Sequence, residues 1–468
     1  MEFNKLQKAW TKKYDVVLEQ LNKLKNIKTV ACAFNTNIDA IYKISGKELT
    51  SLIKENNICI NNIDNSSISD VNTPKEIIKG MAKCFIKGIA EEWIIEDIEI
   101  YNWLDKNIGY TKLQMGGQAG IIANALALFG IKDVVAHTNS LPKLQAEQFL
   151  DLDNLLSFDE EGTLKKANSI SRKQDLPLIH WIIEFDKGDK IEIDNTVYEC
   201  PKSNRFIATY DPMNMNLVMN NSFISYVQKT PIEYLILSGF NPLLESNNGL
   251  ELINNAVKII ENWKTQNPEM IIHLEIASTQ DKVIRKAIVE KIAPISHSIG
   301  LNERETIDVL NVISENKLAT EIENNTNACN LFKAIEIIMK KVKPQRIQLH
   351  MFGLYLTIQS NKFKHSNENN LKGMMCASVV SSSKALNGEL SKPEDTTKAY
   401  GMEVSEIGLR ELDELSKMLN KPELLETGMC EYDGFSISAI PTILIDKPKT
   451  LVGMGDTISS VSLLAGKY

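Results

Sequence analysis

Short apolar runs alternate with helical segments through the second half of the chain, and this alternation most restricts the possible folds. From about residue 216 onward, predicted strands and apolar runs at 234–240, 270–276, 297–302 and 346–358 alternate with predicted helices near 248–263, 280–291 and 328–342. Such alternation favours an α/β fold, with a mostly parallel sheet and helices on both of its faces.

The first half of the chain contains similar elements and one block that differs. Apolar spacing predicts a helix over 2–26, buried strands at 29–34 and 134–137, and helices from 74 to about 89 and after Gly120. A polar, Asn- and Ser-rich stretch covers about 56–74. In 178–210, the apolar runs 178–185 and 190–193 flank a hairpin-like signal at 186–189, and another strand follows at 206–210. This β-rich block, with part of 40–115, is a candidate second domain.

Composition excludes several classes of function. Lys and Arg number 52 and Asp and Glu number 60, so the net charge is −8, which argues against a nucleic-acid partner. No apolar run approaches the ~20 residues that span a bilayer, and the charged N-terminal segment does not read as a signal peptide. The seven cysteines form no CxxC pair, which argues against disulfides and a cysteine zinc site. We expect a cytoplasmic protein with neither nucleic-acid nor membrane partners.

The segment Gly453-Met454-Gly455-Asp456 opens a predicted helix near the end of the sequence. Two glycines let the backbone approach a ligand closely, and a helix N-terminus favours a phosphate or a developing anion. Asp456 would be either the N-cap of this helix or a general base beside an anion hole. The motif alone does not separate these alternatives. No Walker A sequence occurs in the chain.

Acidic residues follow two of the predicted strands. Glu275 lies near the end of the strand at 270–276, and Asn302 and Glu305 come just after the strand HSIGLN at 297–302. Carboxylates at strand ends suit a Mg²⁺ ion held through water. The alternatives are a strand end that turns into solvent and an acidic helix N-terminus stabilised by the helix dipole.

Polar residues also follow the first predicted strand. A short carboxylate and an amide there suit neighbouring sugar hydroxyls, and backbone N–H groups after a glycine pair would add donors; the alternative is ordinary turn chemistry. The residues concerned are Asn37, Asp39, Gly116, Gly117 and Gln118. His180 reads as either a half-buried histidine or a sugar ligand, and Arg205 as either a phosphate clamp or a surface arginine.

Taken in this order, the segments resemble the motifs of the archaeal ADP-dependent sugar kinases, the glucokinases, phosphofructokinases and their bifunctional relatives. The segments are 35–40, 115–120, 273–275 (HxE), 302–305 (NxxE) and 453–456 (GxGD). The resemblance runs from about residue 30 to the C-terminus. It implies a large ribokinase-like α/β domain (1–38, 116–165 and 216–468) and a smaller β-rich lid domain (39–115 and 166–215).

The resemblance also implies roles for individual residues. ADP is the expected phosphoryl donor, AMP the product, and Mg²⁺ or another divalent cation the cofactor. Asp456 is the expected catalytic base, Gly453, Met454 and Gly455 the anion hole, and Arg205 the arginine that reaches from the lid to the nucleotide phosphates. Glu275, Glu305 and Asn302 are expected to organise the metal through water. The expected sugar-binding residues are Asn37, Asp39, Gly116, Gly117, Gln118 and His180.

The acceptor sugar depends on a glutamate of the lid. Glucokinases of this family have a glutamate where dedicated phosphofructokinases have alanine, and we align Glu91 to that position, with Glu92 as the choice if the register shifts by one. A carboxylate there suits a hydroxyl and repels a 6-phosphate, although Arg172, Lys173 and Lys202 could offset that charge. We therefore expect a bifunctional enzyme acting on fructose 6-phosphate and glucose.

Other functions stay open from the sequence alone. They are a kinase specific for one of the two sugars, an ATP-dependent ribokinase-like sugar kinase and a non-enzymatic sugar-binding protein. His350 and Tyr355, in a plausible strand pair, are the candidate nucleotide-binding residues. We expect a monomer or a small homo-oligomer with small-molecule partners.

Overall fold

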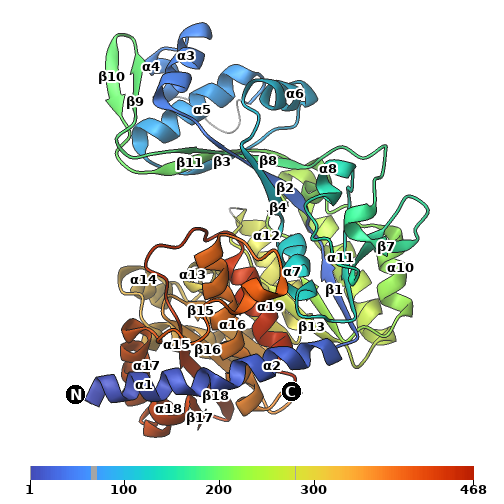
Figure 1. Ribbon diagram of the computed structural model, residues 1–468, viewed down its shortest axis with the longest axis vertical. Coiled ribbons are helices and arrows are strands. Elements are labelled where there is room, and N and C mark those ends of the chain that lie inside the picture. The colour runs from blue at the N-terminus through green and yellow to red at the C-terminus, as the bar shows by residue number, and fades with distance from the viewer. Residues whose placement is uncertain (1, 65–70, 280) are drawn as a thin grey trace.

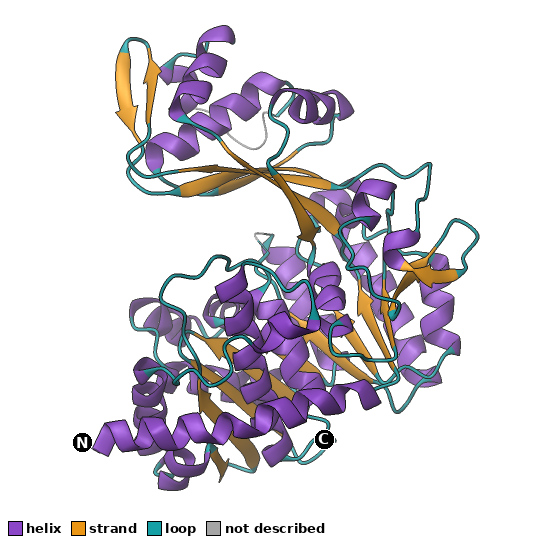
Figure 2. Ribbon diagram, in the orientation of Figure 1, coloured by secondary structure: helices purple, strands orange, loops and turns teal. Residues whose placement is uncertain are grey.

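The computed structural model describes residues 2–64, 71–279 and 281–468. The described residues form two main sheets (Figure 1). We call the eleven-stranded sheet with the helices that cover it the large unit, and the five-stranded sheet with its helices the small unit. The small unit lies at the top of the view, and strands β2, β4 and β8 reach down from it toward the large unit (Figures 1 and 2). Residues 65–70 of the predicted polar stretch lie outside the described residues.

The sheet of the large unit is mixed and has a parallel centre. Neighbouring strands from β15 to β6 pair in parallel, whereas β16, β18 and β17 on one edge and β7 on the other pair antiparallel. In spatial order the strands of the described chain are β17 (Met429–Tyr432), β18 (Phe435–Pro441), β16 (Leu354–Gln359), β15 (Arg346–Met351), β14 (Ser298–Leu301), β13 (Ile271–Glu275), β12 (Tyr234–Leu237), β1 (Thr29–Ala33), β5 (Asp133–Ala136), β6 (Leu155–Phe158) and β7 (Leu164–Lys166). The α/β fold is confirmed, and the finer ribokinase-like assignment stays a prediction.

Helices cover both faces of this sheet. In front of it in Figure 1, α19 (Met454–Ala465) packs between α7 (Gln118–Ala127) and α16 (Asn367–Asn387). A second series of neighbouring helices contains α10 (Asn221–Lys229), α11 (Gly249–Gln266), α12 (Lys282–Ala287), α13 (Glu303–Val312), α14 (Asn316–Asn324), α15 (Ala328–Val342), α17 (Glu406–Leu419) and α18 (Pro422–Thr427). The predicted N-terminal helix is α1 (Glu2–Lys13) and α2 (Val17–Asn22), which are joined and followed by 3₁₀ turns.

The small unit has a five-stranded sheet with helices on one face. Its strands, in spatial order, are β3 (Glu91–Ile94), β11 (Asn204–Tyr210), β8 (Ile179–Phe185), β2 (Asn37–Lys43) and β4 (Lys112–Gly116). The helices are α3 (Gly46–Glu55), α4 (Ile60–Asp64), α5 (Pro74–Lys87) and α6 (Ile98–Asn107). This unit is therefore richer in helix than expected, and its boundaries as a domain stay a prediction.

The hairpin expected around residues 186–189 is wrong. Strand β8 pairs with β11 and β2, whereas β9 (Lys190–Ile193) pairs with β10 (Thr196–Glu199). Asp194 and Asn195 join β9 to β10, and both have positive φ angles, of 50° and 59°. Two left-handed residues suit a tight antiparallel turn, because their twist matches that of the strands. The turn that makes the hairpin is thus one strand later than predicted.

Each unit has its own hydrophobic cluster. Trp10 and Trp263 are buried in the large unit's cluster, and Trp93 and Trp181 in that of the small unit. Alternation along β8 places Ile179, Trp181 and Ile183 in this second cluster, so His180 faces the opposite side of the sheet. No helix among the described residues is both long and apolar enough to cross a membrane.

Because the two clusters are separate, we expect damage to one to leave the other protected. Trp181 is 0% exposed, and replacing it with alanine removes packing worth about 3–5 kcal/mol. In W181A, amide hydrogen exchange should accelerate in β2, β8 and β11 while β12 and β13 keep wild-type protection. Equal loss of protection in both sheets would contradict this separation.

Candidate active site

A cavity of about 360 Å³ lies where the two units meet, and most of the predicted site residues line it. The small unit contributes Asn37, Asp39, Glu92 and His180. From the large unit come Asn35, Gly117, Gln118, Asn241, Glu275, Asn302, Glu305, His350 and the segment 451–456. The fold therefore gathers motifs that are more than 400 residues apart in the sequence.

The GxGD segment forms the first turn of α19. Gly453 is the helix N-cap with φ +62°, and a Cβ atom there would lie 2.6 Å from the side chain of Ile121. At Gly455 a Cβ atom would lie 2.8 Å from His350 Nε2. Both glycines thus let the backbone lie close to neighbouring side chains. Because the first N–H groups of a helix have no partner within it, those of α19 are available to an anion.

Asp456 is inside the helix, so its reading as the N-cap is wrong. Its Oδ1 accepts a hydrogen bond of 3.0 Å from Gln118 Nε2. Burial raises the pKa of Asp456 above its ordinary value, while the Gln118 hydrogen bond and the charge of Lys384 oppose the shift. The side chain lines the cavity, where a carboxylate held by one amide can accept a proton.

Lys384 on α16 was missed by the sequence analysis. Its Nζ donates to Gly453 O at 3.1 Å and to Thr457 Oγ1 at 3.3 Å. Burial lowers the pKa of Lys384 to about 8, and the charge of Asp456 opposes this shift. The lysine therefore fixes the glycine turn and places a positive charge behind Asp456. Only the packing of α16 on α19 could have revealed it.

The predicted acidic group is buried beside α19. Asn302 and Glu305 form a capping box, because Glu305 N donates to Asn302 Oδ1 at 3.0 Å and Asn302 N donates to Glu305 Oε2 at 2.7 Å. Burial raises the pKa of Glu305 to about 8, and Asp456 adds to the shift. The pKa of Glu275 is also raised, first by burial and then by Glu305 and Asp456. The helix-cap reading is therefore correct, and it does not exclude a binding role.

These side chains fit a hydrated cation better than a directly chelated one. Among residues 2–64, 71–279 and 281–468, no three His, Cys, Asp or Glu side chains are close enough to hold a metal ion directly. Glu275, Glu305 and Asn302 nevertheless line one cavity with oxygen atoms. Carboxylate and amide oxygens that leave room for water suit Mg²⁺, which keeps several of its waters.

Glu275 is backed by a buried relay, of which the sequence indicated His273, in the HxE motif, but not Ser298 or Arg346. His273 Nε2 lies 3.3 Å from Glu275 Oε2, and His273 Nδ1 lies 3.0 Å from Ser298 Oγ. Arg346 on β15 donates to the same Ser298 Oγ at 3.0 Å and is 0% exposed. The guanidinium supplies buried positive charge opposite the acidic group. The neighbouring strands β13, β14 and β15 bring these residues together.

The predicted sugar residues of β2 are strand residues, so turn chemistry does not explain them. Asn37 Nδ2 donates to Asp39 Oδ1 at 3.1 Å, and both side chains line the cavity. A Cβ atom on Gly116 would lie 2.3 Å from each of these atoms. Gly116 itself does not line the cavity; it leaves the space that these two side chains occupy. Gly117, with φ +73°, caps α7.

The structure corrects the register of the glutamate expected to bind the sugar, since Glu92 and not Glu91 lines the cavity. Glu91 does not line the cavity; its carboxylate lies 2.9 Å from Lys83 Nζ and accepts a hydrogen bond from Trp93 Nε1. Alternation along β3 places Trp93 in the small unit's cluster, so Glu91 shares that side and Glu92 faces the cavity. Glu92 accepts a 2.7 Å hydrogen bond from Thr209 Oγ1.

The predicted cationic residues of the small unit do not line the cavity. Arg205 is exposed and lies on β11, four residues before Thr209, so it shares the face of the sheet that carries Glu92 and His180. Arg172 is buried, with its guanidinium bonded to Thr138 and Asp175. Lys173 and Lys202 are exposed. His180 is the one cationic side chain among the described residues of the cavity wall.

A second cavity, of about 280 Å³, adjoins the first and contains both predicted nucleotide residues. His350, Leu451 and Met454 line both cavities, and Tyr355, Phe352 and Ile443 line only the second. Burial lowers the pKa of His350 to about 4, so its ring is neutral. The wall is mostly apolar, with hydroxyls from Ser381 and Ser382, which suits a flat, partly polar ring.

Comparison with known proteins identifies the family. A model of the ADP-specific phosphofructokinase/glucokinase conserved region matches residues 28–465. The chain is 29% identical over 457 residues to an ADP-specific phosphofructokinase of Methanosarcina acetivorans, covering 92% of each protein. It is 29% identical over 468 residues to an ADP-dependent glucose/glucosamine kinase of Pyrococcus abyssi, covering 98% of each.

Solved structures agree with this match. An ADP-dependent kinase in complex with fructose-6-phosphate and ADPβS is 30% identical, with a TM-score of 0.81 over 98% of each chain. The last common ancestor of ADP-dependent phosphofructokinases from Methanosarcinales is 29% identical, with a TM-score of 0.86 over 100% of this chain and 99% of that one. The chain belongs to the ADP-specific phosphofructokinase/glucokinase family, as its motifs predicted.

We expect Glu305→Gln to stabilise the protein while impairing the site. Glutamine preserves the capping box. The folded protein holds a proton on Glu305 up to a pKa of about 8 instead of the ordinary 4.5, so wild-type stability falls as the pH rises between these values. In EDTA, E305Q should therefore melt higher than wild type at pH 8, by about 1–3 °C, and converge with it toward pH 4.5. A lower melting temperature at pH 8 would contradict this expectation.

Proposed function

We propose that the protein transfers the β-phosphoryl group of ADP to a sugar hydroxyl and releases AMP. The observation that carries this proposal is the single cavity that joins the N-terminus of α19, Asp456, a buried acidic pair and a polar sugar-sized wall. Membership of the family agrees with it. Phosphoryl transfer requires mainly positioning and charge stabilisation, and this cavity offers both.

Asp456 is the proposed catalytic base. Gln118 fixes one of its oxygens, which leaves the other free to accept the proton of the attacking sugar hydroxyl. The raised pKa of Asp456, caused by burial, makes the carboxylate a better proton acceptor than a solvated one. The hydroxyl oxygen then forms a bond to the β-phosphorus as the bond to the AMP oxygen breaks.

Gly453, Met454 and Gly455 form the proposed anion hole. Their backbone lies at the N-terminus of α19, where free N–H groups and the helix dipole stabilise negative charge on the transferred group. Lys384 holds this turn through the carbonyl of Gly453. No reorganisation is needed as the charge develops, since these groups are already in place.

Glu275, Glu305 and Asn302 are the proposed holders of Mg²⁺. When bound, the ion would neutralise charge on the phosphates of the nucleotide. The chain's own part is to keep the two glutamates in place through the capping box of Asn302 and the His273 relay.

Arg205 is the proposed phosphate ligand from the small unit. Its strand face is the one that faces the cavity, but its side chain is exposed and lies beyond the cavity wall. We infer that the small unit acts as a lid whose closure brings this guanidinium onto the nucleotide phosphates. Closure would also exclude water, which suppresses hydrolysis of ADP.

The second cavity is the proposed nucleotide-base site. It adjoins the proposed anion hole through Met454 and Leu451, so a base there and a phosphate at α19 can belong to one ligand. Neutral His350 and Tyr355 form part of its wall. Tyr355 donates to or accepts from Ser381 at 3.1 Å, so its hydroxyl is already oriented.

We propose glucose and fructose 6-phosphate as acceptors, with a neutral sugar favoured. The proposed sugar residues are Asn37, Asp39, Glu92, Gly117, Gln118 and His180, with Gly116 as their support. Asp39 and Glu92 are carboxylates, and His180 is the single cationic residue of the described wall. This charge balance suits hydroxyls better than a phosphate dianion.

The state of the cysteines bears on the compartment in which the protein works. The described cysteines, at 32, 59, 84, 200, 329, 376 and 430, are all free thiols, as is usual in reducing compartments. We propose a cytoplasmic enzyme, either a monomer or a small homo-oligomer.

A phosphoryl-transfer assay tests the activity. Purified protein with Mg²⁺ should convert ADP to AMP with glucose and with fructose 6-phosphate, and D456N should lower kcat by about 10³-fold or more with little change in KM. Turnover with ATP but not ADP would place the chain among ATP-dependent sugar kinases. Sugar binding without turnover under any condition would favour a non-enzymatic sugar-binding protein.

Glu92 and Glu91 form a matched pair that tests the corrected register. E92Q removes a cavity carboxylate, so the KM for glucose should rise about tenfold or more. The ratio of the KM for fructose 6-phosphate to the KM for glucose should therefore fall. E91Q changes a carboxylate on the other face of the same strand and should leave both constants close to wild type. The reverse outcome would restore Glu91 as the sugar ligand.

A further inference from the structure

The sugar end of the cavity contains one imidazole among carboxylates. His180 lies opposite Asp39 on β2 and opposite Thr209 on β11 in the strand register, and Thr209 donates to Glu92 on β3. Asp39, His180 and Thr209 thus form one row across the sheet, and the hydrogen bond from Thr209 extends this row to the carboxylate of Glu92, which is in register with Ile207. The protonation state of His180 therefore decides whether this row has a cationic donor.

Asp211 lies behind this row and does not line the cavity. It directly follows β11, is 2% exposed, and its Oδ2 lies 3.0 Å from His180 Nε2. This contact occupies Nε2 of the ring. Nδ1 has no hydrogen-bond partner among the described residues, and it is the nitrogen left for a ligand in the cavity.

Asp211 is itself held in place by the large unit. It is the N-cap of α9 (Pro212–Met215), where Oδ1 accepts from Asn214 N at 3.1 Å and Oδ2 accepts from Asn214 Nδ2 at 2.8 Å. Asn214 also donates to Thr36 O at 3.1 Å and accepts from Asn139 Nδ2 at 2.6 Å. The carboxylate therefore has little freedom to leave His180.

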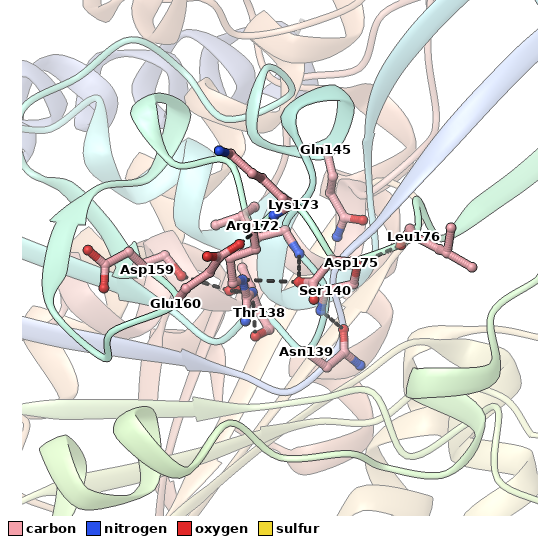
Figure 3. A network of polar contacts seen from close by, with 12 residues as sticks. Thr138, Asn139, Ser140, Gln145, Asp159, Glu160, Arg172, Lys173, Asp175 and Leu176 are labelled. Carbon is pink, nitrogen blue, oxygen red and sulfur yellow. Dashed lines mark hydrogen bonds and ion pairs between the residues drawn. The ribbon is translucent and has the colours of Figure 1, made fainter.

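A polar network around Arg172 holds the loop that contains Asn139 (Figure 3). Arg172 donates to Thr138 Oγ1 at 2.7 Å, and Ser140 Oγ donates to Leu176 O at 2.6 Å. These bonds tie the loop after β5, which contains Asn139, to the segment that leads into β8 (Figure 3). Since β8 carries His180, the same network sets the position of both partners of the contact.

We propose that Asp211 is a positioning residue of the sugar site, which holds His180 as an imidazolium whose Nδ1–H is presented to an oxygen of the acceptor sugar. This inference rests on the proposed function and adds to it a residue outside the cavity. The donor so presented is charged, and hydrogen bonds from charged donors are stronger than neutral ones. Binding of the sugar then depends on a carboxylate that the sugar never touches.

The electrostatics of the row agree with this assignment. The charged groups that face His180 are Asp211 after β11, Asp39 on β2 and Glu92 on β3. Burial lowers the pKa of His180, but the hydrogen bond and charge of Asp211, with the other two carboxylates, outweigh it and raise the pKa to about 9. The ring is therefore charged at neutral pH.

The variant Asp211→Asn separates charge from structure. Asparagine is also a good N-cap, so the bond from Asn214 N and α9 can persist while the negative charge and the bond from Asn214 Nδ2 are removed. We expect the KM for glucose at pH 8 to rise about tenfold with kcat reduced less than threefold. At pH 6, where His180 of the variant is again protonated, the KM should return to within about threefold of wild type.

Asp281→Asn is the matched control, since Asp281 is the N-cap of α12 and does not line the cavity. It should leave the KM for glucose unchanged at both pH values. A D211N effect of equal size at pH 6 and pH 8 would overturn the proposal, because it would indicate a purely structural role.

A readout that does not need activity distinguishes this inference from the proposed function. The ¹³Cε1–¹H resonance of His180, assigned with His180→Gln, should titrate near pH 9 in the wild-type protein and at least one pH unit lower in D211N. An unchanged titration would overturn the role of Asp211 even if the kinase activity is confirmed. The expected titration with no kinase activity would retain the pair and refute only the proposed function.

Discussion

A group of three buried carboxyl side chains is the constraint on which the rest of this structure depends. Glu275, Glu305 and Asp456 line one cavity, and burial raises the pKa of each. The charges of Glu305 and Asp456 raise the pKa of Glu275 further, and the charge of Asp456 does the same for Glu305. An apolar interior would not tolerate this group without opposing charge. The opposing charge comes from the N-terminus of α19, Lys384 and Arg346. These three positive groups thus help to keep the three acids together.

The sequence predicted those parts of the site whose position follows from parallel topology. Glu275 and Asn302 come at the ends of successive parallel strands, β13 and β14, and such ends meet at one edge of the sheet. Asn302 also shows that two readings of one residue can both hold, since it caps α13 and lines the cavity. Local pattern was sufficient because chain order and spatial order agree here.

The errors and omissions have a different physical origin. Glu91 and Glu92 are adjacent, and only the burial of Trp93 decides which of them faces the cavity. The misplaced hairpin arose because β8 found partners distant in the sequence, β2 and β11. Lys384, Arg346 and Asp211 act through contacts with residues 31 to 69 positions away. The residues next to them in the sequence give no indication of these contacts, so the contacts could not be predicted.

The route of the chain between the two sheets has a mechanical consequence. It passes from one sheet to the other between β1 and β2, between β4 and α7, before β8, and after β11. Asn37, Gly117 and Asp211 stand at these passages, and His180 comes two residues into its strand. Two of the proposed sugar ligands, Asn37 and Gly117, therefore stand where the chain crosses between the units. A sugar bound to them would contact both units at once, so a substitution at either residue would change substrate affinity together with the stiffness of the connection between the units.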